Sequence, residues 1–93
     1  MKLVNHINHM DQEGSVYCCL RNRVVKLTSK QKENFCHGCM MFGGFIRGGG
    51  VECEWLDSRE VSNPHIVFDP KQEFISNQKK RQTRLDVTAQ LAN

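Results

Sequence analysis

Five cysteines in a chain of 93 residues constrain the fold more than any other feature of this sequence. Cys36 and Cys39 form a C-x-x-C turn, and Cys53 follows that turn. An adjacent pair, Cys18 and Cys19, precedes it. Zn²⁺ in structural sites takes four thiolate or imidazole ligands, and a short chain with a small core often relies on such a metal. The pattern therefore predicts one structural Zn²⁺ ion as a cofactor, with one cysteine more than the ion needs.

The fourth ligand has two candidates, because adjacent residues of a strand point to opposite faces and only one can readily reach the ion. Cys53 lies on the apolar face of the alternating segment 51–56. Cys18 lies on the matching apolar face of the first strand, between Val16 and Leu20. The predicted metal ligands are Cys18, Cys36, Cys39 and Cys53, with Cys19 as the alternative to Cys18.

Three other interpretations of the cysteines stay open. Unmodified cysteine behaves as a small apolar residue, so several of these thiols could simply be buried. A redox dithiol is a second interpretation, although such motifs sit between a strand and a helix of a βαβ unit, which this sequence does not indicate. An iron–sulfur cluster also accepts four thiolates, but the common ferredoxin spacings are absent. Covalent haem attachment is excluded, because Met40 and not histidine follows Cys39.

Nothing in the sequence indicates an enzyme. A closed set of four thiolates leaves no coordination position for water or substrate. No Ser/His/Asp set and no carboxylate pair stands out, so we expect no catalytic residue and no small-molecule substrate. His6 and His9 are interpreted as parts of an exposed arm, and His65 as a structural residue at the start of a strand.

The odd number of cysteines and the lack of an apolar stretch of signal-peptide length favour a reducing compartment, so we expect a cytoplasmic protein. No stretch approaches the roughly 20 apolar residues of a membrane span. Residues 1–70 carry eight Lys or Arg and eight Asp or Glu, whereas residues 71–93 carry five against two. The body is thus nearly neutral and the C-terminal segment is basic.

The predicted fold class is α+β, a small zinc-stabilised domain with short antiparallel strands and a C-terminal helix or tail. We expect a flexible N-terminal arm over 1–14, the zinc-binding domain over 15–75 and a basic, mobile tail over 76–93. The expected strands lie near 15–27, 51–56 and 65–68. Thr28 or Ser29 should cap a short helix, and Asp69 with Pro70 should begin the C-terminal one.

A protein partner is the first binding hypothesis. The segment 36–50 combines six glycines with apolar side chains that suit an adaptable interface, and we expect it to be irregular and to fold over the metal site. The candidate interface residues are Met40, Met41, Phe42, Phe45 and Ile46. The nearly neutral body favours this hypothesis over the next.

Nucleic acid is the second binding hypothesis, because cations that contact phosphates supply most of the affinity for it. The candidate contacts are Lys79, Lys80, Arg81 and Arg84, helped by Arg21, Arg23, Lys26 and Arg47. The two hypotheses differ in salt dependence, because binding to phosphates weakens steeply as salt rises.

The run from Phe35 to Phe42, continued from Gly50 to Trp55, resembles the small four-cysteine, zinc-ribbon-like proteins of bacteria and their phages. The resemblance covers about 40 residues and differs from the usual ribbon in having one C-x-x-C pair instead of two. It implies bound zinc and an accessory or regulatory role. It implies no particular substrate or partner.

Overall fold

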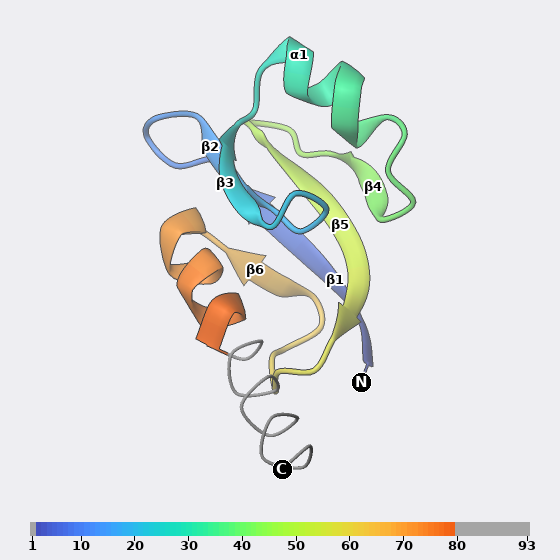
Figure 1. Cartoon of the computed structure of the whole chain (residues 1–93), viewed down its shortest axis with the longest axis vertical. Helices are drawn as coiled ribbons and strands as arrows, with labels where there is room; N and C mark the ends of the chain where they lie inside the picture. Colours follow the sequence, from blue (N-terminus) through green and yellow to red (C-terminus); the bar gives the residue numbers. More distant parts are fainter. Residues whose placement is uncertain (1, 80–93) are drawn as a thin grey trace, which may run out of the picture.

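The computed structural model describes residues 2–79, which form two β-sheets and three helical segments (Figure 1). The first sheet has four strands in the order β4-β5-β1-β6, and the second pairs β2 with β3. The elements are β1 (Lys2–His9), β2 (Ser15–Cys18), β3 (Arg23–Lys26), α1 (Ser29–Gln31), the π-helical turn η1 (Lys32–Cys36), β4 (Phe42–Phe45), β5 (Gly50–Asp57) and β6 (His65–Val67). Residues 70–79 form a further helix. These elements confirm the α+β class.

Strand β1 lies inside the four-stranded sheet, which corrects the flexible arm expected over 1–14. It pairs antiparallel with β5 from Lys2↔Asp57 to His9↔Gly50, and it also pairs with β6. Its inward positions are Val4, His6 and Asn8, and all three are buried. Two of these three side chains are polar, so the alternation of a half-buried strand is not visible as an alternation of hydrophobicity.

The strands expected near 15–27 and 51–56 are confirmed. Val, Tyr and Cys residues between two turns form the β2–β3 hairpin, which pairs from Ser15↔Lys26 to Cys18↔Arg23. In β5, Val51 and Asp57 are buried while Glu54 and Leu56 are exposed, as the sequence alternation indicates. Cys53 therefore faces the interior, beside the β2–β3 hairpin.

Strand β6 confirms the expected strand near 65–68, but it runs parallel to β1, which corrects the expectation of antiparallel strands only. The helix that follows begins as predicted, because the Asp69 carboxylate accepts a hydrogen bond from the Gln72 amide at 3.1 Å. Helical residues continue through 76–79, which corrects the prediction of a mobile tail over these four residues. The rest of that predicted tail lies outside the described residues.

The segment 36–50, expected to be irregular, contains the short edge strand β4, which pairs antiparallel with β5 and has a register shift between Phe42 and Gly44. Gly50 ends the following turn with φ +143°, and a Cβ atom there would collide with the carbonyl oxygen of Asn8. Glycine is therefore required where this turn joins the sheet.

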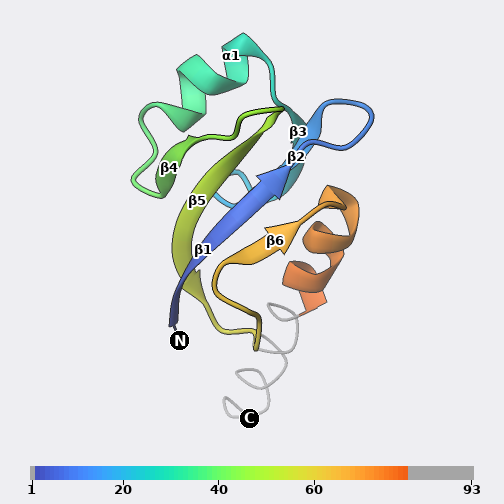
Figure 2. The same cartoon turned by 180° about the vertical axis from the view of Figure 1, so that it is seen from behind.

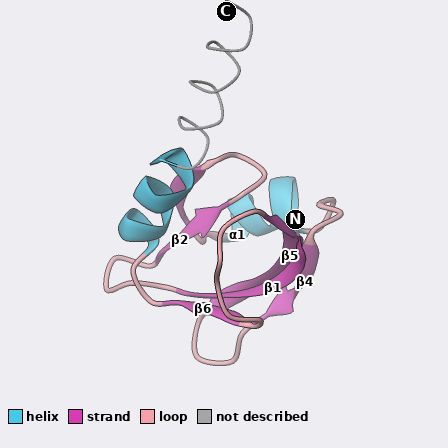
Figure 3. Cartoon of the chain, turned by 90° about the horizontal axis from the view of Figure 1, so that it is seen from below, coloured by secondary structure: helices cyan, strands magenta, loops and turns pink. Residues whose placement is uncertain are grey.

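Both helical regions and the β2–β3 hairpin lie on one side of the four-stranded sheet, as the views from behind and from below show (Figures 2 and 3). The apolar core between these layers contains Val16, Val25 and Val51. Cys18 and Cys53 pack against the same cluster. The covered side of the sheet therefore contains both the core and the cysteines.

Candidate metal centre

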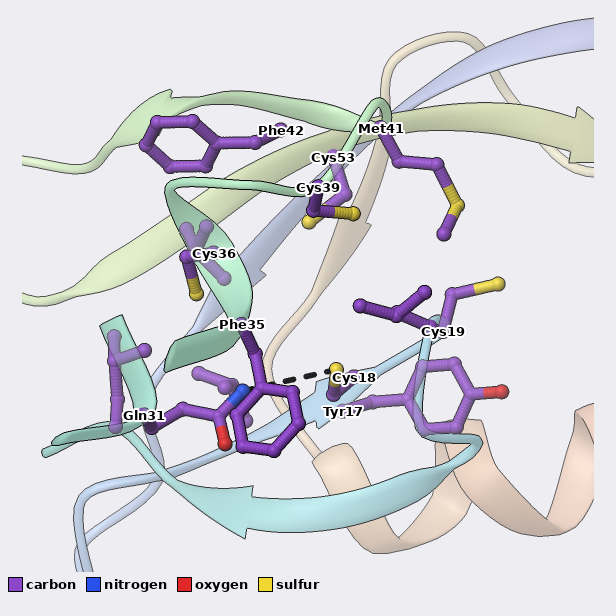
Figure 4. A pocket seen from close by; sticks show the side chains of 14 residues that line it. Tyr17, Cys18, Cys19, Gln31, Phe35, Cys36, Cys39, Met41, Phe42 and Cys53 are labelled. Carbon is purple, nitrogen blue, oxygen red and sulfur yellow. Dashed lines mark hydrogen bonds between the residues drawn. The ribbon is translucent and has the colours of Figure 1, made fainter. Parts of the chain in front are cut away.

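All five cysteines line one small, mainly apolar cavity, which we call the thiol cavity (Figure 4). Cys18 comes from β2 and Cys19 from the turn after it, Cys36 ends η1, Cys39 lies in the next turn, and Cys53 is in β5. The cavity measures about 20 Å³, which is close to the space that one water molecule needs. Thiols from three separate segments thus line one space about the size of a single water molecule.

The sulfur of Cys18 points toward Cys39 and Cys53, whereas the sulfur of Cys19 points away from them (Figure 4). No disulfide forms among the five residues, all of which lie within the described range. In residues 2–79, no three Cys, His, Asp or Glu side chains are close enough to form a ready-made metal site. The preference for Cys18 over Cys19 as the fourth metal ligand stays a prediction.

The thiols influence one another electrostatically. Burial, followed by the thiolate charge of Cys39 and then of Cys18, raises the pKa of Cys53 to about 12. Burial and the charge of Cys18 also raise the pKa of Cys36. The set holds soft sulfur donors in an apolar surrounding, which fits Zn²⁺ or another thiophilic ion. The thiols of Cys36 and Cys53 therefore favour the protonated form at neutral pH.

Gln31 connects the helical turn to the thiol cavity, and sequence analysis did not single it out. Thr28 caps α1 by accepting the amide of Gln31 at 3.2 Å, which confirms the predicted cap. The buried Gln31 side chain donates to the sulfur of Cys18 at 3.8 Å and accepts from Arg21 at 2.8 Å. Gln31 therefore connects the position of Cys18 to that of Arg21.

The predicted interface residues are divided between the cavity and the surface. Met41 and Phe42 line the thiol cavity, and Phe42 also stacks at an angle on Phe45, with ring centroids 4.8 Å apart. Met40 is fully exposed. Ile46 is half-buried in the turn before β5. Of this set, Met40 offers the most apolar surface to a partner.

The predicted nucleic-acid contacts are described only in part. Lys79 is exposed at the last described residue, and Lys80, Arg81 and Arg84 lie outside the described range. A hollow of about 430 Å³ beside β3 collects other cations, namely Arg21, Arg23, Lys26 and Lys30. Phe35 also lines it, and the Arg21 guanidinium lies 4.2 Å from the centre of that ring.

A second cluster on the covered side of the sheet was missed by sequence analysis. We call it the charged network, and it consists of His6, Asp57, Arg59, His65 and Glu73. Arg59 bridges the two carboxylates, with its Nη2 atom 2.6 Å from Asp57 Oδ2 and 2.9 Å from Glu73 Oε2. His6 lies 2.8 Å from Asp57, and His65 lies 3.2 Å from Glu73.

The histidines expected in an exposed arm have defined contacts. His6 is fully buried and stacks on Trp55 with ring centroids 3.8 Å apart. His9 stacks on Phe68 with centroids 4.6 Å apart. Burial lowers the pKa of His6 despite its hydrogen bond to Asp57, so this imidazole favours the neutral form.

Ionisation of the two carboxylates is stabilised inside the charged network. Burial opposes the charge of Asp57, but hydrogen bonds from Arg59 and His6 outweigh it and hold its pKa well below the usual range. Burial likewise opposes the charge of Glu73, and hydrogen bonds from Arg59 and His65 lower its pKa. Burial also disfavours the charged form of Arg59, yet its hydrogen bonds to Glu73 and Asp57 raise its pKa. Every member of this cluster has a hydrogen-bond partner, although the Nδ1 atom of His6 is buried without one.

Comparison with protein-family models, with curated proteins and with solved structures gave no match to this chain. Among the described residues, no helix is long and apolar enough to cross a bilayer. Any functional proposal therefore rests on the residues and their geometry.

Proposed function

We propose that this chain is a non-catalytic zinc-binding protein that acts by binding another protein. One observation carries the zinc proposal: thiols separated by up to 35 positions in the sequence, Cys18 to Cys53, line a single cavity of about 20 Å³. Bound Zn²⁺ would ionise these thiols and release their protons, because thiolates are the ligands of this metal. The ligands we propose are Cys18, Cys36, Cys39 and Cys53.

The protein-binding part of the proposal is supported by the position of the C-x-x-C turn. Met40 and Met41 follow Cys39 directly, and the amide of Glu54 donates to the carbonyl oxygen of Met41 at 2.7 Å. Zinc held between Cys39 and Cys53 would fix this segment against β5. A metal with four protein ligands leaves no position for substrate, so its role here is to shape a surface.

Metal content and folding test the zinc proposal. Protein purified without oxygen should contain close to one zinc per chain by native mass spectrometry, and a strong chelator should reduce its near-ultraviolet circular dichroism. Cys18→Ser should lose stoichiometric zinc, and the matched Cys19→Ser variant should keep it. The proposal is overturned if the chain binds no zinc, binds iron with sulfide instead, or keeps an unchanged spectrum after metal removal.

A second candidate function is binding of single-stranded nucleic acid, because one hollow combines four cations with the aromatic ring of Phe35. Phosphates and stacked bases use this pairing of charge and aromatic surface. Affinity for a fluorescent oligonucleotide should then fall steeply with salt and fall further in Arg23→Glu. A pull-down with and without nuclease separates this function from the first, since only partners held through nucleic acid disappear after digestion.

A further inference from the structure

Among residues 2–79, no helix or hairpin packs on one face of the four-stranded sheet (Figure 3). Side chains at the odd positions of β1 and the even positions of β5 lie there, opposite the buried positions of the same strands. Leu3 and Leu56 are partners in the register, and each is more than half exposed. Ile7 and Ile66 form a second register pair on this face, with Ile66 49% exposed. Exposed apolar pairs of this kind mark a surface that another molecule covers.

The β4 end of this face is hollowed. The hollow measures about 400 Å³, and its walls combine the apolar residues Leu3, Met40 and Met41 with the polar residues Asn5, Glu52 and Glu54. Met40 is fully exposed, and Glu54 is exposed as well. Flexible methionine side chains can adapt to the shape of a bound segment.

The charges at the hollow select its occupant. Glu52 and Glu54 are two positions apart on β5, and within residues 2–79 no strand position on this face of the four-stranded sheet carries Lys or Arg. Phosphate backbones and anionic membranes are repelled by such a surface. A second copy placed face to face would bring the same carboxylates together, which disfavours a symmetric dimer here.

We propose that this hollow binds a cationic amphipathic segment of another protein. Apolar side chains of that segment would pack on Leu3 and the two methionines. A Lys or Arg of the segment would pair with Glu52 and Glu54. The inference deepens the protein-binding function proposed above and rests on it. The segment that carries both methionines follows Cys39, so one wall of the hollow is anchored at the thiol cavity. Recognition then combines apolar contact for affinity with charge for selectivity.

Three fluorescein-labelled ten-residue peptides test the chemistry on the full zinc-loaded chain by fluorescence anisotropy. The first peptide contains leucine and lysine, the second contains leucine and glutamate, and the third contains serine and lysine. All three have the same length. We expect saturable binding of the leucine–lysine peptide, with affinity at least tenfold above that of the other two. Raising salt should weaken this binding without abolishing it, since the apolar contribution is not screened.

Variants of the protein locate the site. Glu54→Lys should lower the affinity for the leucine–lysine peptide at least tenfold. Glu33→Lys makes an equal charge change at an exposed position of η1 and should leave this affinity unchanged. Met40→Ser should also weaken binding, and Ile75→Ser, at a partly exposed position of the C-terminal helix, should not. Far-ultraviolet circular dichroism on each variant confirms that the fold is retained.

Each opposite result overturns the docking site. Equal binding of the serine–lysine peptide would mean charge attraction alone, and equal binding of the leucine–glutamate peptide would mean apolar adhesion alone. The docking site would also be contradicted if Glu54→Lys and Glu33→Lys lost equal affinity for the peptide. The absence of any peptide binding would contradict it too, as would self-association in sedimentation equilibrium in place of peptide binding. Zinc content measured on the same samples separates this outcome from failure of the zinc proposal, because a zinc-loaded chain that binds no peptide refutes the docking site only.

Discussion

The thiol cavity and the charged network lie along the same strand, yet they are stabilised in different ways. Cys53 faces the first region and Asp57 faces the second, four residues further along β5. In the charged network, Arg59 lies within 3.0 Å of a carboxylate oxygen of both Asp57 and Glu73. In the thiol cavity, burial raises the pKa of Cys53 to about 12 and no cation is among the lining residues.

This difference separates charged side chains that pair with one another from thiols that have no charged side chain beside them in their cavity. Buried ions are tolerated when each has a partner, as in the charged network. Buried thiols need no partner while they stay protonated, but they become strong ligands once a metal displaces their protons. The two regions should therefore respond to different perturbations.

Removing the metal should have the largest effect, and it should act on the thiol cavity first. A structural zinc site contributes on the order of 10 kcal/mol in small peptides near neutral pH. In hydrogen exchange, we expect chelation to remove protection from β2, β3 and η1 more than from the β1–β6 pair, which borders the charged network. Equal loss of protection across all strands would contradict separate stabilisation of the two regions.

Arg59→Met should give the next largest loss of folding stability, and this loss should arise in the charged network. It leaves Asp57 and Glu73 buried and without their cation, a change that costs about 3–5 kcal/mol in comparable sites. Denaturant unfolding of the zinc-loaded protein measures this loss. The exposed Arg47 provides a control, and Arg47→Met should change the free energy of unfolding by less than about 0.5 kcal/mol. Zinc content should stay the same in both variants.

Acid should weaken the charged network through Asp57 and Glu73, which face His6, Arg59 and His65. Their pKa values are lowered from unfolded values of 3.8 and 4.5, so the stability they add is complete above those values. It is lost as pH falls through the lower folded values, by about 1.4 kcal/mol per unit of pKa difference.

Urea unfolding of the zinc-loaded chain between pH 6 and pH 3 measures this loss, and comparison with a double variant removes the contribution of zinc release, which both proteins share. The double variant Asp57→Asn with Glu73→Gln should have a flatter dependence below pH 4.5 than the parent chain. An equal dependence in both proteins would show that other carboxyl groups control acid unfolding.

Thr28→Ala should produce the smallest loss of folding stability, and it should act on the side of the thiol cavity. Loss of the hydrogen bond from the Thr28 hydroxyl to the Gln31 amide costs about 1 kcal/mol. Because Gln31 also holds Cys18, zinc affinity should fall slightly as well. Ser29→Ala, one residue later and inside α1, is the matched control and should leave both quantities nearly unchanged. Thermal unfolding and competition with a zinc-binding dye measure the two effects.

The elements that could be predicted from sequence are those with local signals. Alternation in Val51 to Leu56, the cap at Thr28 and the Asp69-Pro70 pair each depend on neighbouring residues, and all three are present in the structure. The cysteine spacing likewise predicted that distant thiols share one region, and all of them line the same cavity. Whether that cavity holds zinc stays a prediction.

The elements that could not be predicted depend on contacts between distant residues. Histidine at position 6 looks solvent-exposed in sequence, and only its partners Trp55 and Asp57, about 50 positions away, make its burial favourable. The same holds for Arg59, whose bridge to Glu73 joins a loop to the C-terminal helix. Polar residues in a strand hide its alternation when their partners come from elsewhere in the chain.

The central position of β1 also sets an order for folding. β1 has its neighbours at positions 50–57 and 65–67, so it can pair only after those residues have been synthesised. The β2–β3 hairpin and the α1 turn need only nearby residues and can form earlier. Synthesis should therefore yield the hairpin first, and the sheet should close in one late step when β6 arrives beside β1.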